Sequence, residues 1–428
     1  MHTIDKDSSP LAPVSFNEES AWREFQSDRD TFFKRGSVVT VPLDRGMTLA
    51  DRRALIATIT ARHDIFRTAY DTTGGVVGRH TLVDYPHSVM EADEPGYPVP
   101  GRHDSYLMPE DVARMWLTPG PDGTDLLSLD LNEMITDTWS CARLHEEILR
   151  LVRDGDRSES NGIGIGYADF AREERERPLS PETAEYWRGQ LAGVSGLSGL
   201  QPDGPDPSGD TAGERVFVLP DELTAAFREV CRRFRLSSFM AVASIVNMTL
   251  AALTHDRDIL LTTTGGTRAA RWTEVQGNFS NHVVLRTMLG TDPTFTEVAA
   301  ASRATTLGAL RHQPAPYLQL GEILGAPPPR PPIRIHFLAN RAHHYAVLDT
   351  KPSGAAWVEN AAFAAWPLDI GFAEDGHNRI AIWLSYDPRK YTHATVDRVI
   401  RSCGQTLREV QASEELTCGA LADRLPRE

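Results

Sequence analysis

The chain has 428 residues, of which 41% are hydrophobic and 24% are charged, as is ordinary for a folded globular protein. Its length exceeds that of one average core and suits two lobes. The formal net charge of −15 argues against nucleic-acid binding, which relies on lysine and arginine to neutralise phosphates. The four cysteines show no CxxC spacing and the N-terminus has no apolar core. We therefore expect reduced thiols in a cytoplasmic protein without membrane attachment.

Helix and strand patterns alternate in the first part of the chain. Thr48 is followed by Asp51 three positions later, which resembles a capping box and predicts a helix that begins there. The apolar run 126–131 predicts a buried strand, and a stripe of apolar residues at helical spacing follows Trp139. Residues 132–138 therefore form a strand-to-helix connection, the kind of segment that often carries function.

A linker is predicted near the middle of the chain. Ser180 can cap a helix whose first residue is Pro181. The segment 196–213 that comes after this helix is rich in Gly, Pro, Ser and Asp. We expect it to separate an N-terminal lobe, residues 1–195, from a C-terminal lobe, residues 214–428.

The second half repeats the alternation of elements. Residues 237–253 are apolar but short for a bilayer, and they predict a buried helix. Strands are predicted at 258–264, 333–338 and 380–386, and an amphipathic helix at 396–410. Strands and helices in both halves predict an α/β or α+β fold with mixed sheets.

Seven segments resemble, in order, the successive motifs of the condensation domains of nonribosomal peptide synthesis. Arg62 to Thr68 is similar to RHExLRT, and Asn132 to Ser140 falls where HHxxxDGxS belongs. The other five segments are 12–22 (PLSxxQxxxW), 167–170 (YxDY), 186–193 (YWxxxLxG), 277–286 (GxFxNxxxxR) and 312–317 (HQDxPF). Each motif is weak alone, but the shared order makes the resemblance specific.

This resemblance implies two lobes like chloramphenicol acetyltransferase, arranged as a V-shaped pseudo-dimer in one chain. It implies a tunnel that admits the phosphopantetheine arms of carrier proteins. The reaction would be acyl transfer from a carrier-bound thioester to an amine or another nucleophile. No bound cofactor or metal is expected, the carrier proteins would act in trans, and a monomer is expected.

The signature of the family is degenerate in this chain. Asn132 and Glu133 replace the two histidines, of which the second serves the family as a general base or positioning acceptor. Glutamate has a reference pKa about two units below that of histidine, so it is the weaker base unless burial raises its pKa. Either Glu133 has taken over catalysis or the site is no longer used for chemistry. Heterocyclisation relatives carry DxxxxD, which this chain matches only at Asp137.

Roles for the neighbouring residues follow from the same resemblance. Asp137 is expected to pair with Arg67 and fix the loop. Thr138 replaces the glycine, which would narrow the channel or force a different turn. Trp139 is expected to pack, and Ser140 to cap the following helix.

Two residues of the second half are also candidates for the site. Asn281 matches the family asparagine near the tunnel. His282 follows it and would replace the missing imidazole if its side chain pointed inward. Three functions stay open at this point: a trans-acting acyltransferase, a binding module that recruits a carrier protein or tailoring enzyme, and a repurposed catalyst.

Overall fold

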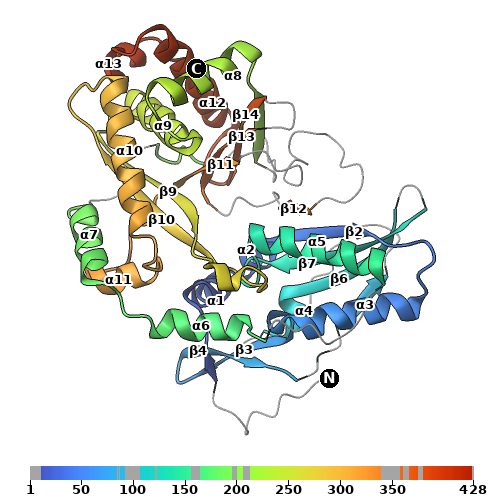
Figure 1. The fold of residues 1–428 in the computed structure, drawn as a ribbon. Coiled ribbons are helices and arrows are strands. Elements are labelled where there is room, and N and C mark those ends of the chain that lie inside the picture. The colour runs from blue at the N-terminus through green and yellow to red at the C-terminus, as the bar shows by residue number, and fades with distance from the viewer. Residues whose placement is uncertain are drawn as a thin grey trace. The chain divides into compact units, whose positions relative to one another are not determined.

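The fold comes from a computed structural model (Figure 1). It describes residues 11–83, 85, 87–91, 107–120, 123–155, 164–194, 200–205, 213–338, 357–359, 366–374 and 379–426.

The chain divides into two compact units. Unit 1 comprises Met1–Pro178, Arg268–Ser280 and Lys351–Asn360, and unit 2 comprises Leu179–Thr267, Asn281–Thr350 and Ala361–Glu428. This division differs from the predicted lobes in two ways. The boundary lies near Pro178 and not at 195, and two later segments belong to the first unit.

Unit 1 contains two sheets and most of the N-terminal helices. One sheet has three strands in the order β1-β4-β3, and the other has five in the order β12-β2-β7-β6-β5. The strands of unit 1 are β1 (Ala12–Pro13), β2 (Gly36–Pro42), β3 (Thr68–Thr73), β4 (Val76–Thr81), β5 (Val89–Glu91), β6 (Ala113–Pro119), β7 (Asp125–Asn132) and β12 (Trp357–Glu359). Its helices are α1 (Phe16–Ser27), α2 (Arg29–Lys34), α3 (Leu49–Arg62), α4 (Pro109–Val112), α5 (Thr138–Asp154) and α6 (Tyr167–Glu176).

Unit 2 is built on one six-stranded sheet with the order β10-β9-β11-β13-β14-β8. Its strands are β8 (Glu214–Val218), β9 (Asp258–Gly266), β10 (Ser280–Met288), β11 (Ile333–Leu338), β13 (Leu368–Glu374) and β14 (Ile380–Tyr386). Its helices are α7 (Pro181–Leu191), α8 (Asp221–Arg233), α9 (Ser238–Thr254), α10 (Phe295–Arg311), α11 (Gln319–Leu324), α12 (His393–Ala412) and α13 (Cys418–Ala422).

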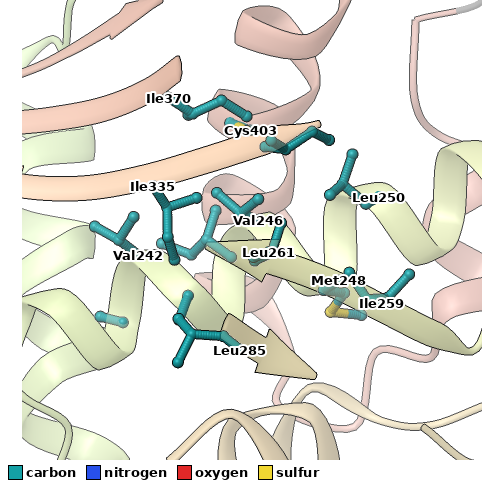
Figure 2. Close-up of a cluster of buried hydrophobic side chains, with 14 of the residues drawn as sticks. Val242, Val246, Met248, Leu250, Ile259, Leu261, Leu285, Ile335, Ile370 and Cys403 are labelled. Atoms are coloured by element: carbon teal, nitrogen blue, oxygen red, sulfur yellow. The ribbon is translucent and has the colours of Figure 1, made fainter. Parts of the chain in front are cut away.

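The core of unit 2 lies between this sheet and its helices. Figure 2 shows Val246 of α9 among Leu261 of β9, Ile335 of β11 and Cys403 of α12. Helix α9 is almost wholly buried because its apolar residues surround the helix axis, as expected of a helix inside a core. No single helix in the described ranges is long and apolar enough to cross a membrane. Helices α8 and α9 reach the required length and apolar composition only when they are taken together, and they are bent by 104° at the break between them.

Most of the predicted elements are present in the structure. Thr48 caps α3 in a capping box with Asp51, and Ser180 caps α7 ahead of Pro181. The predicted strands and helices of the second half correspond to α9, β9, β11, β14 and α12. The mixed α/β class is therefore confirmed. Cys141, Cys231, Cys403 and Cys418 are all free thiols.

The predicted linker is only partly within the described residues, which include 200–205 and 213. Within that part, Leu200 is buried in the unit 2 core. The Asp203 carboxylate accepts hydrogen bonds from the Thr392 backbone N–H, 3.0 Å away, and from the hydroxyls of Thr392 and Thr395. Polar composition suggested a spacer, but these residues pack against the start of α12.

Candidate functional site

The degenerate motif lies between the end of β7 and the start of α5. Pairing of β7 with β2 places Asn132 opposite Gly36. A short turn follows, and α5 begins at Thr138 with Asp137 as its N-cap. Asp137 has an extended backbone, and no residue from 132 to 138 has a positive φ. Thr138 thus replaces the family glycine without forcing a strained turn.

Asp137 uses both carboxylate oxygens for structural hydrogen bonds. Its Oδ1 accepts from the Ser140 backbone N–H at 2.7 Å, and its Oδ2 accepts from the Phe279 backbone N–H at 2.8 Å. The Arg268 guanidinium lies 3.2 Å from each oxygen. Burial lowers the pKa of Arg268, and the charge of Asp137 offsets part of that effect. These bonds fix the start of α5 to the segment 268–280.

The predicted pair of Asp137 with Arg67 is wrong. Arg67 instead donates to backbone carbonyls, those of Thr60 at 3.1 Å, Leu82, and Val83 at 3.3 Å. These carbonyls lie at the end of α3 and after β4, so Arg67 fixes a neighbouring corner of unit 1. The resemblance to the family made Arg67 the expected partner, but Arg268 is brought to Asp137 by a segment that returns from much later in the chain.

Ser140 is not the helix cap that the sequence suggested, because Asp137 takes that role. The buried Ser140 hydroxyl donates to the Gly277 carbonyl at 2.7 Å and accepts from the Gly277 N–H at 3.1 Å. It also accepts a hydrogen bond from Arg268 at 2.7 Å. Gly277 is required at this contact, since its φ is +154° and an added Cβ would lie 1.9 Å from Tyr167 Cδ2.

Glu133 occupies the family base position and is held in an ion pair. Its carboxylate Oε2 lies 2.5 Å from Arg35 Nη2, and Arg35 also pairs with Glu24. The Glu133 backbone carbonyl accepts from the Asn278 side chain at 2.7 Å. The Glu133 side chain is 32% exposed, so solvent reaches it. A guanidinium at this distance favours the charged carboxylate and competes with a proton for the same lone pairs.

Asn132, at the position of the first histidine, is a structural residue. Its side-chain amide donates to the Phe32 carbonyl at 2.7 Å, and its Oδ1 accepts from the Met134 N–H at 2.8 Å. Asn132 is buried, as Met134 is. These bonds join α2 to the turn after β7, and an amide has no proton-accepting role at neutral pH.

Trp139 lies at the surface of unit 1, beside the exposed Thr138. Its indole N–H donates to the Thr273 carbonyl at 3.2 Å, and the side chain is 38% exposed. Its ring therefore contributes a tether between α5 and the segment 268–280 in addition to packing.

Asn281 and His282 belong to unit 2 and face different surroundings. The Asn281 amide donates to the carbonyls of Gln313 and Ala315, both at 2.8 Å, and its Oδ1 accepts from the Tyr317 N–H. Asn281 thus holds the turn after α10. The His282 ring packs against Trp366, with 4.8 Å between ring centroids.

A cavity of about 690 Å³ lies beside α5 in unit 1. His63 Nε2 lies 2.8 Å from Glu147 Oε2, and Arg62 donates to the other oxygen of Glu147 at 3.0 Å. Burial alone would raise the pKa of Glu147, but the hydrogen bonds and charges of His63 and Arg62 outweigh it and lower the pKa to about 2. The carboxylate in this wall is therefore charged and fully used in structural contacts.

Two residues that decide what this loop can do were not predicted from the sequence. They are Arg268 and Arg35. Arg268 carried no local signal, because it lies far from Asp137 along the chain. Arg35 directly precedes β2, so a prediction that β2 pairs with β7 would have placed it beside Glu133. Together they turn the two acidic side chains of the motif into ion-pair partners. Within the described ranges, no group of three or more His, Cys, Asp or Glu side chains could hold a metal ion.

Comparisons with known proteins agree with this architecture. Residues 121–422 match the family model of the condensation domain. The chain is 28% identical over 96% of its length to one of the proteins that make up the linear gramicidin synthase of Brevibacillus parabrevis. It is 26% identical over 73% of its length to phosphinothricin tripeptide synthetase PhsC of Streptomyces viridochromogenes. It spans only 9% and 31% of those two proteins.

Solved structures share the fold at lower identity. The X-domain in its complex with OxyB from teicoplanin biosynthesis aligns with a TM-score of 0.77 and 18% identity, covering 98% of each chain. SgcC5 from Streptomyces globisporus aligns with a TM-score of 0.70 and 20% identity, covering 94% of this chain and 99% of that one. With the family model spanning most of the sequence, the chain belongs to the condensation-domain family.

Proposed function

We propose that this chain serves nonribosomal peptide biosynthesis by binding pantetheine-tethered intermediates of separate carrier proteins, and that its motif loop takes no proton in any bond-forming step. The two units would correspond to the two chloramphenicol-acetyltransferase-like lobes of the family. Family membership and the matches to peptide synthetases support the pathway.

One observation carries the second half of this proposal, the 2.5 Å contact between Glu133 and Arg35. A general base must give its lone pair to the proton of the nucleophile. Protonation of Glu133 would break this ion pair and leave the mostly buried Arg35 guanidinium without one of its two carboxylates. Asn132 offers no alternative, because its amide is neutral and already hydrogen-bonded.

A second candidate is acyl transfer to an amine with Glu133 in place of the histidine. The partial exposure of Glu133 favours it, because a substrate ammonium group could reach the carboxylate from solvent. In this reading Arg35 would move aside when substrate binds, and Glu133 would then position or deprotonate the acceptor.

A third candidate is a catalytically inactive module that recruits a carrier protein or a tailoring enzyme. The teicoplanin X-domain, which aligns with this chain over nearly its full length, is in complex with OxyB. The fixed, hydrogen-bonded state of Asp137, Asn132 and Ser140 favours this reading, because it describes a loop that holds structure.

Reconstitution with carrier proteins tests the proposal. We expect the full chain to bind acyl-loaded carrier proteins in isothermal titration calorimetry, and Glu133→Gln to bind them equally well. Mass spectrometry of the pantetheine-bound products then reports bond formation. A product that disappears in Glu133→Gln but persists in the matched control Glu24→Gln would support the second candidate and contradict the proposal about the loop.

A further inference from the structure

The six-stranded sheet of unit 2 carries an imidazole on the face that its apolar core does not use. The strands β11, β13 and β14 are neighbours in this sheet (Figure 1). His336 of β11 lies opposite Gly371 of β13, which in turn lies opposite Trp383 of β14. The sequence neighbour Ile335 points into the apolar core (Figure 2). Because successive side chains of a strand alternate between faces, His336 projects from the opposite face.

A buried carboxylate lies beside this imidazole. Asp369 is only 3% exposed, and its Oδ1 lies 2.8 Å from His336 Nε2. Its Oδ2 accepts from Arg334 Nε at 2.9 Å and from a second nitrogen of the same guanidinium. Burial alone would raise the pKa of Asp369, but the charges of Arg334 and His336 outweigh it and hold the pKa well below its usual range. Asp369 is therefore a fixed negative charge beside the ring.

An indole ring lies alongside the same imidazole. The Trp383 and His336 rings are stacked at 12° with 6.0 Å between their centroids. Gly371 makes room for the indole, since an added Cβ would lie 2.0 Å from Trp383 Cε2. With Asp369 at Nε2 and Trp383 along its face, Nδ1 is the ring nitrogen that no side chain of the described residues contacts, and it is the one proposed to exchange protons. The His336 side chain is 17% exposed.

A second indole, that of Trp366, lies near the start of β11, where its N–H donates to the Pro331 carbonyl. Arg330 and Arg334 both lie over the Trp366 ring, at 5.1 and 5.6 Å from its centroid. His282 of β10 packs against the same indole. Arg334 thus contacts both the Trp366 ring and the carboxylate of Asp369.

We propose that His336, in ion-pair contact with Asp369, is the proton acceptor for acyl transfer from a carrier-bound thioester to a primary amine. This inference rests on the proposed function, because it needs a protein that binds such thioesters. A buried carboxylate that fixes an imidazole and stabilises the imidazolium is the arrangement that acyl-transfer enzymes use. It would return to the chain the imidazole chemistry that Asn132 and Glu133 do not supply.

The proposed step balances without any further reactant. The amine nitrogen attacks the thioester carbonyl carbon, and its proton passes to Nδ1 of His336 as the carbon–nitrogen bond forms. The carbon–sulfur bond then breaks, and the leaving sulfur takes the proton from the imidazolium. The products are an amide and the free pantetheine thiol, and His336 is neutral again.

The test uses the full chain with acetyl-pantetheine as the thioester and benzylamine as the acceptor. Chromatography follows N-benzylacetamide, and the rate is compared with that of the buffer reaction. We expect the acceleration over the buffer reaction to be about 100-fold smaller in His336→Gln than in the unmodified chain. This factor is the lower end of the usual contribution of a general base. Glu133→Gln should stay within twofold of the unmodified chain. His255→Asn, at an exposed histidine after α9, is the matched control and should also stay within twofold.

The pH profile separates proton transfer from a structural role. The rate should rise with pH as one imidazole loses its proton, and His336→Gln should remove that rise. Asp369→Asn should lower the rate, because the imidazolium formed during the reaction loses its negative partner. Circular dichroism checks that each variant is folded. If Asp369→Asn is unfolded, a second measurement is made on the unmodified chain. His336 is labelled with diethyl pyrocarbonate, and we expect the label to abolish the acceleration.

Two results would overturn the proposal. One is an unchanged rate in folded His336→Gln, and the other is no acceleration by the unmodified chain. Binding of acyl-loaded carrier proteins is measured separately and should be equal in the unmodified chain and in His336→Gln. Either of those two results, with carrier binding retained by the unmodified chain, removes only this inference, whereas absence of carrier binding contradicts the proposed function itself.

Discussion

Asp137 and Glu133 lie four residues apart in one loop, yet their carboxylates have opposite surroundings. Asp137 accepts two backbone hydrogen bonds and both of its oxygens face Arg268. Glu133 lies partly in solvent, in an ion pair with Arg35. The comparison teaches that one carboxylate of the loop holds the backbone in place, whereas the other is a partly exposed member of an ion pair.

The difference also explains why the loop keeps its shape without its histidines. Asp137 joins α5 to the segment 268–280 within unit 1, and Asn132 joins the turn to α2 through the Phe32 carbonyl. Neither contact needs an imidazole. The fold of the loop therefore does not depend on an imidazole at either position.

The largest expected effect comes from removing the structural acid. Asp137→Ala should lower the free energy of unfolding by about 3–5 kcal/mol, because Arg268 is left buried without its counter-charge and α5 loses its N-cap. Urea unfolding followed by circular dichroism measures this loss. Asp154→Ala, at the exposed end of the same helix, is the control and should leave the urea midpoint unchanged. An equal midpoint for Asp137→Ala and the control would show that the ion pair with Arg268 is not structural.

Glu147, further along α5, extends the comparison to the pH dependence of the unfolding free energy. Its pKa is lowered from 4.5 to about 2, so its stabilisation is fully present above pH 4.5 and is lost as the pH falls towards 2. The pH-dependent part amounts to about 3 kcal/mol. Unfolding free energies of the unmodified chain and of Glu147→Gln, measured between pH 2 and 6, should therefore converge at low pH.

Glu174 provides a control with the opposite sign. Burial raises the pKa of Glu174 despite a hydrogen bond from the Phe16 N–H. Its contribution is therefore present below its unfolded pKa and is lost as the pH rises through the folded value. The difference in unfolding free energy between the unmodified chain and Glu174→Gln should grow as the pH falls. If the differences for Glu174→Gln and Glu147→Gln change with pH in the same direction, the opposite pKa shifts assigned to the two residues are contradicted.

A smaller effect is expected from the hydroxyl beside Asp137. Ser140→Ala should cost about 1–3 kcal/mol, since the buried Gly277 N–H and carbonyl lose their partner. Differential scanning calorimetry gives the change in Tm. Ser140→Cys keeps a weaker donor and acceptor of similar size, so its Tm should fall between those of the alanine variant and the unmodified chain. If both variants melt with the unmodified chain, the contact with Gly277 contributes nothing to stability.

The smallest stability effect is expected at the partly exposed pair. Arg35→Gln should change the free energy of unfolding by about 1 kcal/mol or less, because a pair with access to solvent contributes little. It should, however, release Glu133, so the rate of acetyl-pantetheine aminolysis is measured in the same variant. An unchanged rate agrees with a loop that takes no proton. A rise that Glu133→Gln reverses would show that Arg35 alone keeps the carboxylate from acting as a base.

Local signals in the sequence predicted much of the fold. Apolar spacing and N-terminal caps placed α3, α7 and α9, because helix starts depend on side chains within three residues of the cap. Alternation of apolar residues placed β11 and β14 for a similar reason. The ordered motifs predicted the family, since their spacing survives even where single residues have changed.

The site was predicted less completely. The sequence located the loop 132–138 and identified Asp137 and Glu133 as its charged groups, but it assigned the wrong arginine to Asp137. It also divided the chain into two continuous lobes, whereas 268–280 returns to unit 1 and 357–359 forms a strand beside β2. Sequence patterns over a few neighbouring residues do not show which later segment of the chain packs into an earlier unit.

The sequence by itself thus determined the elements, the family and the loss of the histidine pair, all of which depend on residues close together in the chain. Only the tertiary structure decided that Arg268 holds Asp137, that Arg35 holds Glu133, and that Asp369 meets His336 across neighbouring strands. The physical reason is that ion pairs and hydrogen bonds act over a few ångströms of space. Chain folding alone sets which distant residues come within that range.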